Sequence, residues 1–164
     1  MAEKGFSYRV TALDGIPLVK AGDDVPGTIL AALAAHDLML QDGDVLVVTS
    51  KIISKAQGRT VNLTDVEPGT DALHYAGITG KDPRLVELVL RESRIVSRAS
   101  KGVLVTEHRL GFVSANAGID QSNAEDGDSR VLLLPLDPDG TAESIRGRMK
   151  AETGADIGVI LSDS

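Results

Sequence analysis

The sequence predicts a mixed α/β fold in which helices flank a mixed sheet, and three observations lead to this prediction. Short apolar runs such as 44–49 (DVLVVT) have the length and β-branched content of buried strands. Between such runs, apolar residues recur at helical spacing behind capping residues, as in 23–34. Near the end of the chain, a strand, a helix and a strand follow one another within 130–161.

The N-terminal half is expected to start with a strand at 6–13 that ends at the turn signal 14–17 (DGIP). A helix should follow, capped by Asp23 or Asp24 and carrying Pro26 in its first turn. Two further strands are predicted, one at 44–49 after the Asp42-Gly43 turn and a weakly alternating one at 57–63.

The C-terminal half begins with a helix that Asp82 caps. The next predicted elements are a strand pair at 94–98 and 102–106, a strand at 130–134, a helix at 141–153 closed by Gly154, and a strand at 157–161. The last strand, helix and strand should form a right-handed unit with parallel strands. Ligands gather beyond the carboxyl ends of such strands, where Asp163 lies.

Composition limits the classes of protein that this chain can belong to. The 164 residues fit one domain, 1–164, and 42% apolar residues suffice for a core although aromatic residues make up only 2%. The net charge of −7 argues against a nucleic-acid or anionic-membrane partner. Without Cys there are no disulfides or thiolate metal sites. No run approaches membrane-spanning length, so we expect a soluble, cytoplasmic protein.

The stretch 113–123 (VSANAGIDQSN) is the most informative part of the sequence. Small residues there let the backbone approach a ligand, and Gly118 permits a sharp turn. Asp120, like Asp163 at the end of the last apolar run, is a candidate ligand for Mg²⁺ or Mn²⁺. The alternative is that Asp120 caps a turn and Asp163 merely follows a strand, while Asn123 either holds a phosphate or closes a turn.

A second polar motif, 49–55 (TSKIISK), follows a predicted buried strand. Its hydroxyl and ammonium groups can hold phosphate oxygens, or they can form a solvated strand end. The glycine-rich turn of a P-loop does not precede Lys51 or Lys55.

Two charged runs and the histidines have simpler interpretations. The run 107–109 (EHR) either enters a site or forms a hairpin turn, and 91–94 (RESR) is interpreted as a solvated helix end. His36, His74 and His108 lack metal-ligand spacing and are interpreted as surface or core residues.

Taken together, these segments resemble one family, the coenzyme F420-0:γ-glutamyl ligases. The resemblance covers nearly the whole chain in order, and the gapless blocks 43–59 and 113–123 make it specific. Its other segments are 15–24, 80–93, 105–123, 132–139 and 159–164.

The resemblance implies a GTP-dependent ligase that joins L-glutamate to coenzyme F420-0 through an amide bond, by way of an acyl phosphate. Members of the family use Mn²⁺ or Mg²⁺, in some cases with K⁺, and form intertwined homodimers. The alternatives are a noncatalytic nucleotide- or cofactor-binding fragment and an interaction domain.

The resemblance also assigns roles to residues of this chain. It implies nucleotide contacts from Ile16, Pro17, Leu18, Val19, Ser50, Lys55 and Asn123, and metal ligation by Asp120, Asp163 and Ser164; it identifies no catalytic acid or base. Family chains continue beyond the Asp-Ser pair, so we expect a family fold that is incomplete at the C-terminus and inactive as a ligase on its own.

Overall fold

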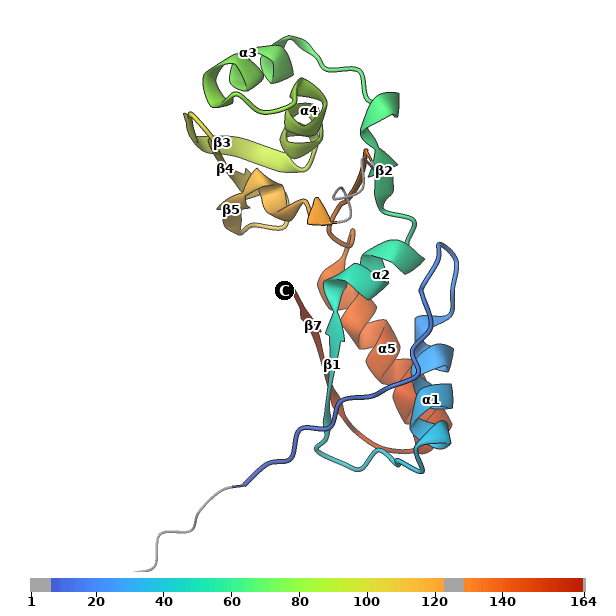
Figure 1. Ribbon diagram of the computed structural model, residues 1–164. Helices are drawn as coiled ribbons and strands as arrows, with labels where there is room; N and C mark the ends of the chain where they lie inside the picture. The colour runs from blue at the N-terminus through green and yellow to red at the C-terminus, as the bar shows by residue number, and fades with distance from the viewer. Residues whose placement is uncertain (1–6, 123–128, 164) are drawn as a thin grey trace, which may run out of the picture.

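The computed structural model describes residues 7–122 and 129–163, and its helices and strands form two groups (Figure 1). The first group contains α3 (Thr70–Thr79), α4 (Pro83–Arg91), β3 (Ser93–Ser100), β4 (Val103–His108) and β5 (Val113–Ala115). The second contains α1 (Val25–Ala35), β1 (Val45–Thr49), α2 (Ser50–Ala56), α5 (Pro138–Thr153) and β7 (Gly158–Ser162). The strands β2 (Thr60–Asn62) and β6 (Arg130–Leu132) connect the two groups.

The strands form small sheets of both kinds, which confirms the mixed α/β class. β3, β4 and β5 make a three-stranded antiparallel sheet, β2 pairs with β6 antiparallel, and β1 pairs with β7 parallel. None of the helices within residues 7–122 and 129–163 is long and apolar enough to cross a membrane.

Most predicted elements are present because their local signals are strong. Asp24 caps α1 by accepting a hydrogen bond from the Gly27 amide, and Asp82 caps α4 in the same way through the Arg84 amide. Gly154, at φ +78°, ends α5 in the left-handed conformation that glycine adopts without strain.

Two predictions about strands are wrong. Residues 7–13 form no strand and run along the surface, with Tyr8 92% exposed and Val10 83% exposed, because no strand within 7–122 and 129–163 pairs with them. The predicted parallel unit is also absent, since β6 pairs with β2 while β7 pairs with β1. The sequence pattern of the unit is present, but it does not specify the partner of either strand.

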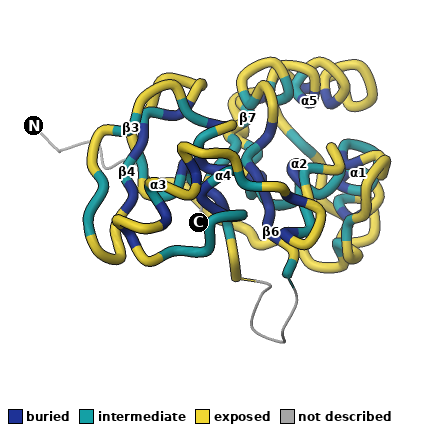
Figure 2. Tube along the Cα trace, turned by 90° about the horizontal axis from the view of Figure 1, so that it is seen from above, coloured by how far each residue is buried: buried dark blue, intermediate teal, exposed yellow. Residues whose placement is uncertain are grey.

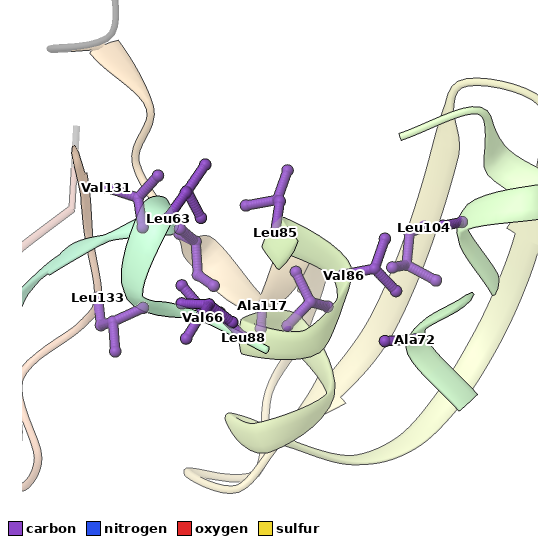
Figure 3. Packing of buried hydrophobic residues seen from close by; sticks show 13 residues of the cluster. Leu63, Val66, Ala72, Leu85, Val86, Leu88, Leu104, Ala117, Val131 and Leu133 are labelled. Atoms are coloured by element: carbon purple, nitrogen blue, oxygen red, sulfur yellow. The ribbon is translucent and has the colours of Figure 1, made fainter. Parts of the chain in front are cut away.

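Each group of elements has its own hydrophobic core. The larger core joins α3, α4, β4 and the segment after β5, and Figure 3 shows Leu85, Val86 and Leu88 of α4 among its members. The smaller core packs α1 and α5 against β1 and β7, through residues such as Ile145 and Met149. Figure 2 shows buried residues on the inner sides of these elements and exposed residues along the outer turns of α1 and α5. Asp120 follows Ile119 of the larger core, and Lys51, which contacts Asp120, precedes Ile52 at the smaller core, so this predicted site residue lies where the two cores meet.

Candidate functional site

The parallel pairing of β1 with β7 creates one end of the candidate site. In this register Thr49 lies opposite Ser162, so the residues that follow each strand lie together. Ser50 is the first residue of α2, and its hydroxyl donates a hydrogen bond of 3.3 Å to Asp163 Oδ1. Ser50 is only 6% exposed. The expectation that Asp163 lies at the carboxyl end of parallel strands is therefore met, with β1 rather than β6 as the neighbour.

A left-handed turn after β5 sets the position of Asp120. Asn116, Ala117 and Gly118 have φ values of +50°, +53° and +68°. Such a conformation is strained for the first two residues, and strain of this kind is concentrated at functional sites. Ala117 is 1% exposed within the larger core, which holds the turn in place. Backbone hydrogen bonds in both directions between Asp120 and Leu132 of β6, each 2.9 Å, then fix the residue.

The carboxylate of Asp120 faces α2. Its Oδ2 atom lies 3.0 Å from Lys51 Nζ, while the amide and hydroxyl of Ser122 donate hydrogen bonds of 2.8 and 2.9 Å. Burial raises the pKa of Asp120, but the hydrogen bonds from Ser122 and the ammonium of Lys51 outweigh it and lower the pKa overall. Asp120 is therefore a carboxylate that already binds a cationic group at neutral pH.

Consecutive residues at the start of α2 thus contact both acids predicted to bind metal. Ser50 contacts Asp163 and Lys51 contacts Asp120, although the two acids follow different strands in different sheets. Thr49 ends β1, and residues 50–55 lie in helix α2, so the interpretation of this motif as a solvated strand end is wrong.

The described residues that were predicted to contact the nucleotide lie in three places. Leu18, Val19 and Lys55 line one cavity of about 610 Å³, together with residues of β2 and β6. Ile16 and Val19 line a second, more apolar groove of about 1020 Å³ between residues 8–13 and β1, and Pro17 is exposed on the same segment. Ser50 belongs with the acids. Asn123 and Ser164 fall outside the described residues.

The positions of the two lysines of α2 distinguish their roles. They are four residues apart and share one face of the helix. Lys51 contacts Asp120, whereas Lys55 is half-buried, borders the smaller cavity and has no ion pair within residues 7–122 and 129–163. Lys55 is therefore the better placed of the two to contact an anionic ligand in that cavity.

The carboxylates of Asp120 and Asp163 are oxygen ligands of the kind that a hard divalent cation takes. The described residues contain no group of three His, Cys, Asp or Glu that could hold a metal ion. Mg²⁺ usually takes one or two carboxylates and completes its shell with water and substrate phosphates. Two observations favour such a site: a lysine ammonium already lies against Asp120, and the buried Thr49 hydroxyl oxygen at the end of β1 has no hydrogen-bond partner among residues 7–122 and 129–163.

A buried charged network beside the site was missed by the sequence interpretation of 91–94 as a solvated helix end. Glu92 is 5% exposed and binds Arg59 at 2.7 Å and Arg109 at 2.9 Å. Arg59 also donates to the Leu134 carbonyl at 2.9 Å, and a side chain at Gly118 would collide with Leu134. The polar run 107–109 between two apolar segments was the one signal of this network.

His108 completes the network as a buried, neutral imidazole. It is 1% exposed and stacks on Phe112, with ring centroids 4.9 Å apart. Its Nδ1 accepts a hydrogen bond from the Leu110 amide, which directs the Nε2 proton toward Glu92, 3.6 Å away. The pKa of His108 is lowered, and burial is the largest cause. The charge of Glu92 raises this pKa, but burial and the charge of Arg109 outweigh it. Of the two interpretations of 107–109, the hairpin turn fits His108, which is structural.

Comparison with known proteins gives matches that agree with one another and cover nearly the whole chain. The profile of one protein family, described as F420-0:Gamma-glutamyl ligase, matches residues 15–164. The chain is 45% identical to the coenzyme F420:L-glutamate ligase of Methanothermobacter thermautotrophicus over 159 residues, which is 97% of this chain and 62% of that protein.

Two further relatives carry the same name. The protein of Methanopyrus kandleri is 42% identical over 93% of this chain and 59% of its own length. That of Archaeoglobus fulgidus is 44% identical over 95% of this chain and 59% of its own length. The chain thus spans about three fifths of the length of the curated relatives that it matches.

Proposed function

The chain belongs to the F420-0:γ-glutamyl ligase family, and we propose that it carries the nucleotide- and metal-binding part of a GTP-dependent ligase that joins L-glutamate to coenzyme F420-0. The observation that carries this proposal is that two adjacent residues of α2, Ser50 and Lys51, contact Asp163 and Asp120, one helical turn before Lys55 at the border of the smaller cavity. The names of the relatives support the ligase class, and the oxygen-rich, cation-binding chemistry of the site supports the use of a nucleoside triphosphate.

The proposed reaction follows from the chemistry of amide formation. A carboxylate resists attack by an amine, so the acceptor's carboxylate first takes the γ-phosphoryl group of GTP and becomes an acyl phosphate. The amine of L-glutamate then attacks the acyl carbon, phosphate leaves, and the amide forms. No protein nucleophile is needed, in agreement with the absence of Cys from the sequence.

Each described residue of the site has a role in this scheme. Lys55 contacts phosphate oxygens through its ammonium group. Asp120 and Asp163 would hold Mn²⁺ or Mg²⁺, which would neutralise negative charge during phosphoryl transfer. Ser50 orients Asp163 through their hydrogen bond. The apolar segment with Leu18 and Val19 lines one side of the cavity.

The proposal includes a homodimer in the cytoplasm. One face of the two-stranded β1–β7 sheet leaves Val45 56%, Val47 61% and Ile160 51% exposed. Apolar side chains gathered in this way are typical of association surfaces. Light scattering at several protein concentrations measures the oligomeric state, and a monomer at all of them contradicts this part of the proposal.

The test combines binding and turnover in one set of conditions. GTP is titrated into the protein by calorimetry with Mn²⁺ and with EDTA, and ATP serves as the control nucleotide. The same protein is then incubated with GTP, Mn²⁺, L-glutamate and F420-0, and mass spectrometry detects the glutamylated product. Mn²⁺-dependent binding of GTP with product supports the ligase. Binding without product favours the noncatalytic nucleotide-binding alternative, and no binding of GTP contradicts both.

A further inference from the structure

The contact between Lys51 and Asp120 places a cation where a metal ion would bind. Lys51 Nζ lies 3.0 Å from Asp120 Oδ2, and among the described residues the other hydrogen bonds to this carboxylate come from Ser122. We propose that Lys51 is an internal counter-ion for Asp120 that a divalent cation must displace, so that this lysine sets the affinity of the site for metal. The inference rests on the metal-binding part of the proposed function.

The geometry makes the two cations mutually exclusive at Oδ2. Oxygen ligands lie about 2.0–2.1 Å from Mg²⁺. An ion bonded to Asp120 Oδ2 would therefore lie within about 5 Å of an ammonium group that kept its present position. Two cations so close repel one another, and the hydroxyl of Ser122 already occupies another direction around the same oxygen. Binding of the ion consequently requires Lys51 to move.

The ion pair of Lys51 with Asp120 has the properties of a contact that can be broken easily. The side chain of Lys51 is 34% exposed and that of Asp120 is 22% exposed, so the pair lies at the surface of the site, where ion pairs are weak. The four-carbon stem of Lys51 is flexible, and its ammonium needs no fixed geometry. When displaced, Lys51 remains on the face of α2 that carries Lys55 one turn further on, at the border of the smaller cavity.

The ammonium of Lys51 also explains how Asp120 remains charged and in place in the absence of metal. The strained turn at Asn116 and Ala117 and the bridge to Leu132 hold the carboxylate at a fixed place. A partly buried carboxylate without a partner would be unfavourable there. Lys51 removes that penalty without filling the site permanently, because a divalent ion carries twice its charge.

Direct metal binding tests the inference without reference to catalysis. Mn²⁺ is titrated without nucleotide into wild type, Lys51→Met and Lys55→Met, with binding followed by electron paramagnetic resonance and calorimetry. Methionine keeps most of the length of the stem and removes the charge. We expect Lys51→Met to bind Mn²⁺ about two- to fivefold more tightly, which is the range of a partly exposed ion pair, and Lys55→Met to stay within about twofold of wild type. Lys51→Gln repeats the test with a polar side chain.

Thermal unfolding gives an independent measurement on the same proteins. Without metal, Lys51→Met should unfold at a lower temperature than wild type, because Asp120 has lost its counter-ion. Mn²⁺ should raise the unfolding temperature of this variant more than that of wild type, because binding no longer displaces a lysine.

The outcomes separate this inference from the proposed function. Unchanged or weaker binding of Mn²⁺ to Lys51→Met overturns the inference and leaves the metal site standing. Equal tightening in both lysine variants also overturns it, because the overall charge would then explain the effect. Binding of Mn²⁺ that is absent from wild type and from both lysine variants contradicts the metal site itself and with it this part of the proposed function.

Discussion

The Arg59 guanidinium lies 2.7 Å from the Glu92 carboxylate and connects the turn after α2 to the end of α4. Both side chains are largely buried, at 15% and 7% exposed. Arg109 binds the same carboxylate at 2.9 Å, so Glu92 neutralises one of two neighbouring arginines. The network lies at the boundary between the two hydrophobic cores and connects them.

Glu92→Gln should destabilise the protein because it leaves two arginines without their shared partner. Loss of one partner from a buried ion pair lowers the free energy of unfolding by about 3–5 kcal/mol. Because Arg109 is partly exposed, we expect a loss of about 3 kcal/mol. Urea unfolding measures the change. The control, Glu143→Gln, removes a carboxylate with a 71% exposed side chain, where we expect about 0–1 kcal/mol. Equal effects of the two variants would contradict a role for the network in stability.

Asp120→Asn should abolish Mn²⁺-dependent binding of GTP and leave the fold intact. The amide keeps the size of the side chain but loses the charge that attracts a cation. Calorimetry with GTP and Mn²⁺ measures binding, and circular dichroism checks the fold. Asp139→Asn, on an exposed residue in the first turn of α5, is the matched control. Affinity like that of wild type in Asp120→Asn would refute the assignment of this residue as a metal ligand.

Lys55→Ala should weaken GTP binding more than Lys51→Ala when Mn²⁺ is saturating. Lys55 borders the smaller cavity without an ion pair, whereas Lys51 is engaged with Asp120. Loss of one charge-assisted contact to phosphate should cost about 1.5–3 kcal/mol. Equal losses in the two variants, measured by the same titration, would indicate that general positive charge and not a specific contact attracts the nucleotide.

Gly118→Ala should destabilise the turn that positions Asp120. A Cβ atom there would lie 2.8 Å from Leu134 Cδ1, and the φ of +68° is strained for alanine. We expect a loss of about 1–3 kcal/mol in chemical unfolding, with weaker binding of Mn²⁺. Gly147→Ala in α5 is the opposite control, because nothing lies within 4 Å of its Cβ position and alanine favours helix, which should add about 0.5–1 kcal/mol. A stability gain in Gly118→Ala would show that the turn is relaxed.

His108 should make the protein less stable as the pH falls below about 6.5. Its pKa is lowered in the folded state, chiefly by burial, so the unfolded chain takes up its proton at a higher pH than the folded chain does. The stability that neutral His108 contributes is therefore complete above its ordinary pKa and is lost as the pH falls through the lowered value. His108→Gln should flatten this part of the stability profile, and exposed His74→Gln should not. An unchanged slope in His108→Gln would contradict the prediction.

The parts of the fold that the sequence predicted are those with strong local signals. Caps at Asp24 and Asp82 and the terminating Gly154 mark three helices correctly. By contrast, α3 has no side-chain cap, and α2 has only seven residues with two adjacent isoleucines, a pattern that fits a strand equally well. Strand partners are set by tertiary packing, which explains why the pairing of β7 with β1 was not predicted.

The candidate site was predicted only in part, because its local sequence signals are visible but its tertiary contacts are not. Asp120 and Asp163 stand out because acids follow apolar or small-residue segments, and the structure connects both to the start of α2. The contact with Lys51 depends on the direction of one helix face, and the burial of Glu92 depends on two arginines distant in the sequence. Neither relation leaves a periodic pattern, so neither could be deduced from the sequence.

The pairing of β1 with β7 also determines when the protein can fold as it is made. Ser50 and Asp163 are 113 residues apart, so β1 leaves the ribosome long before its partner strand exists. Until then its apolar residues have no sheet to join, and contacts between such distant segments form slowly. The other core, whose sheet joins neighbouring segments β3, β4 and β5, can assemble first. Newly made chains should therefore pass through a stage with one finished core and one exposed strand, the stage at which a chaperone would be most useful.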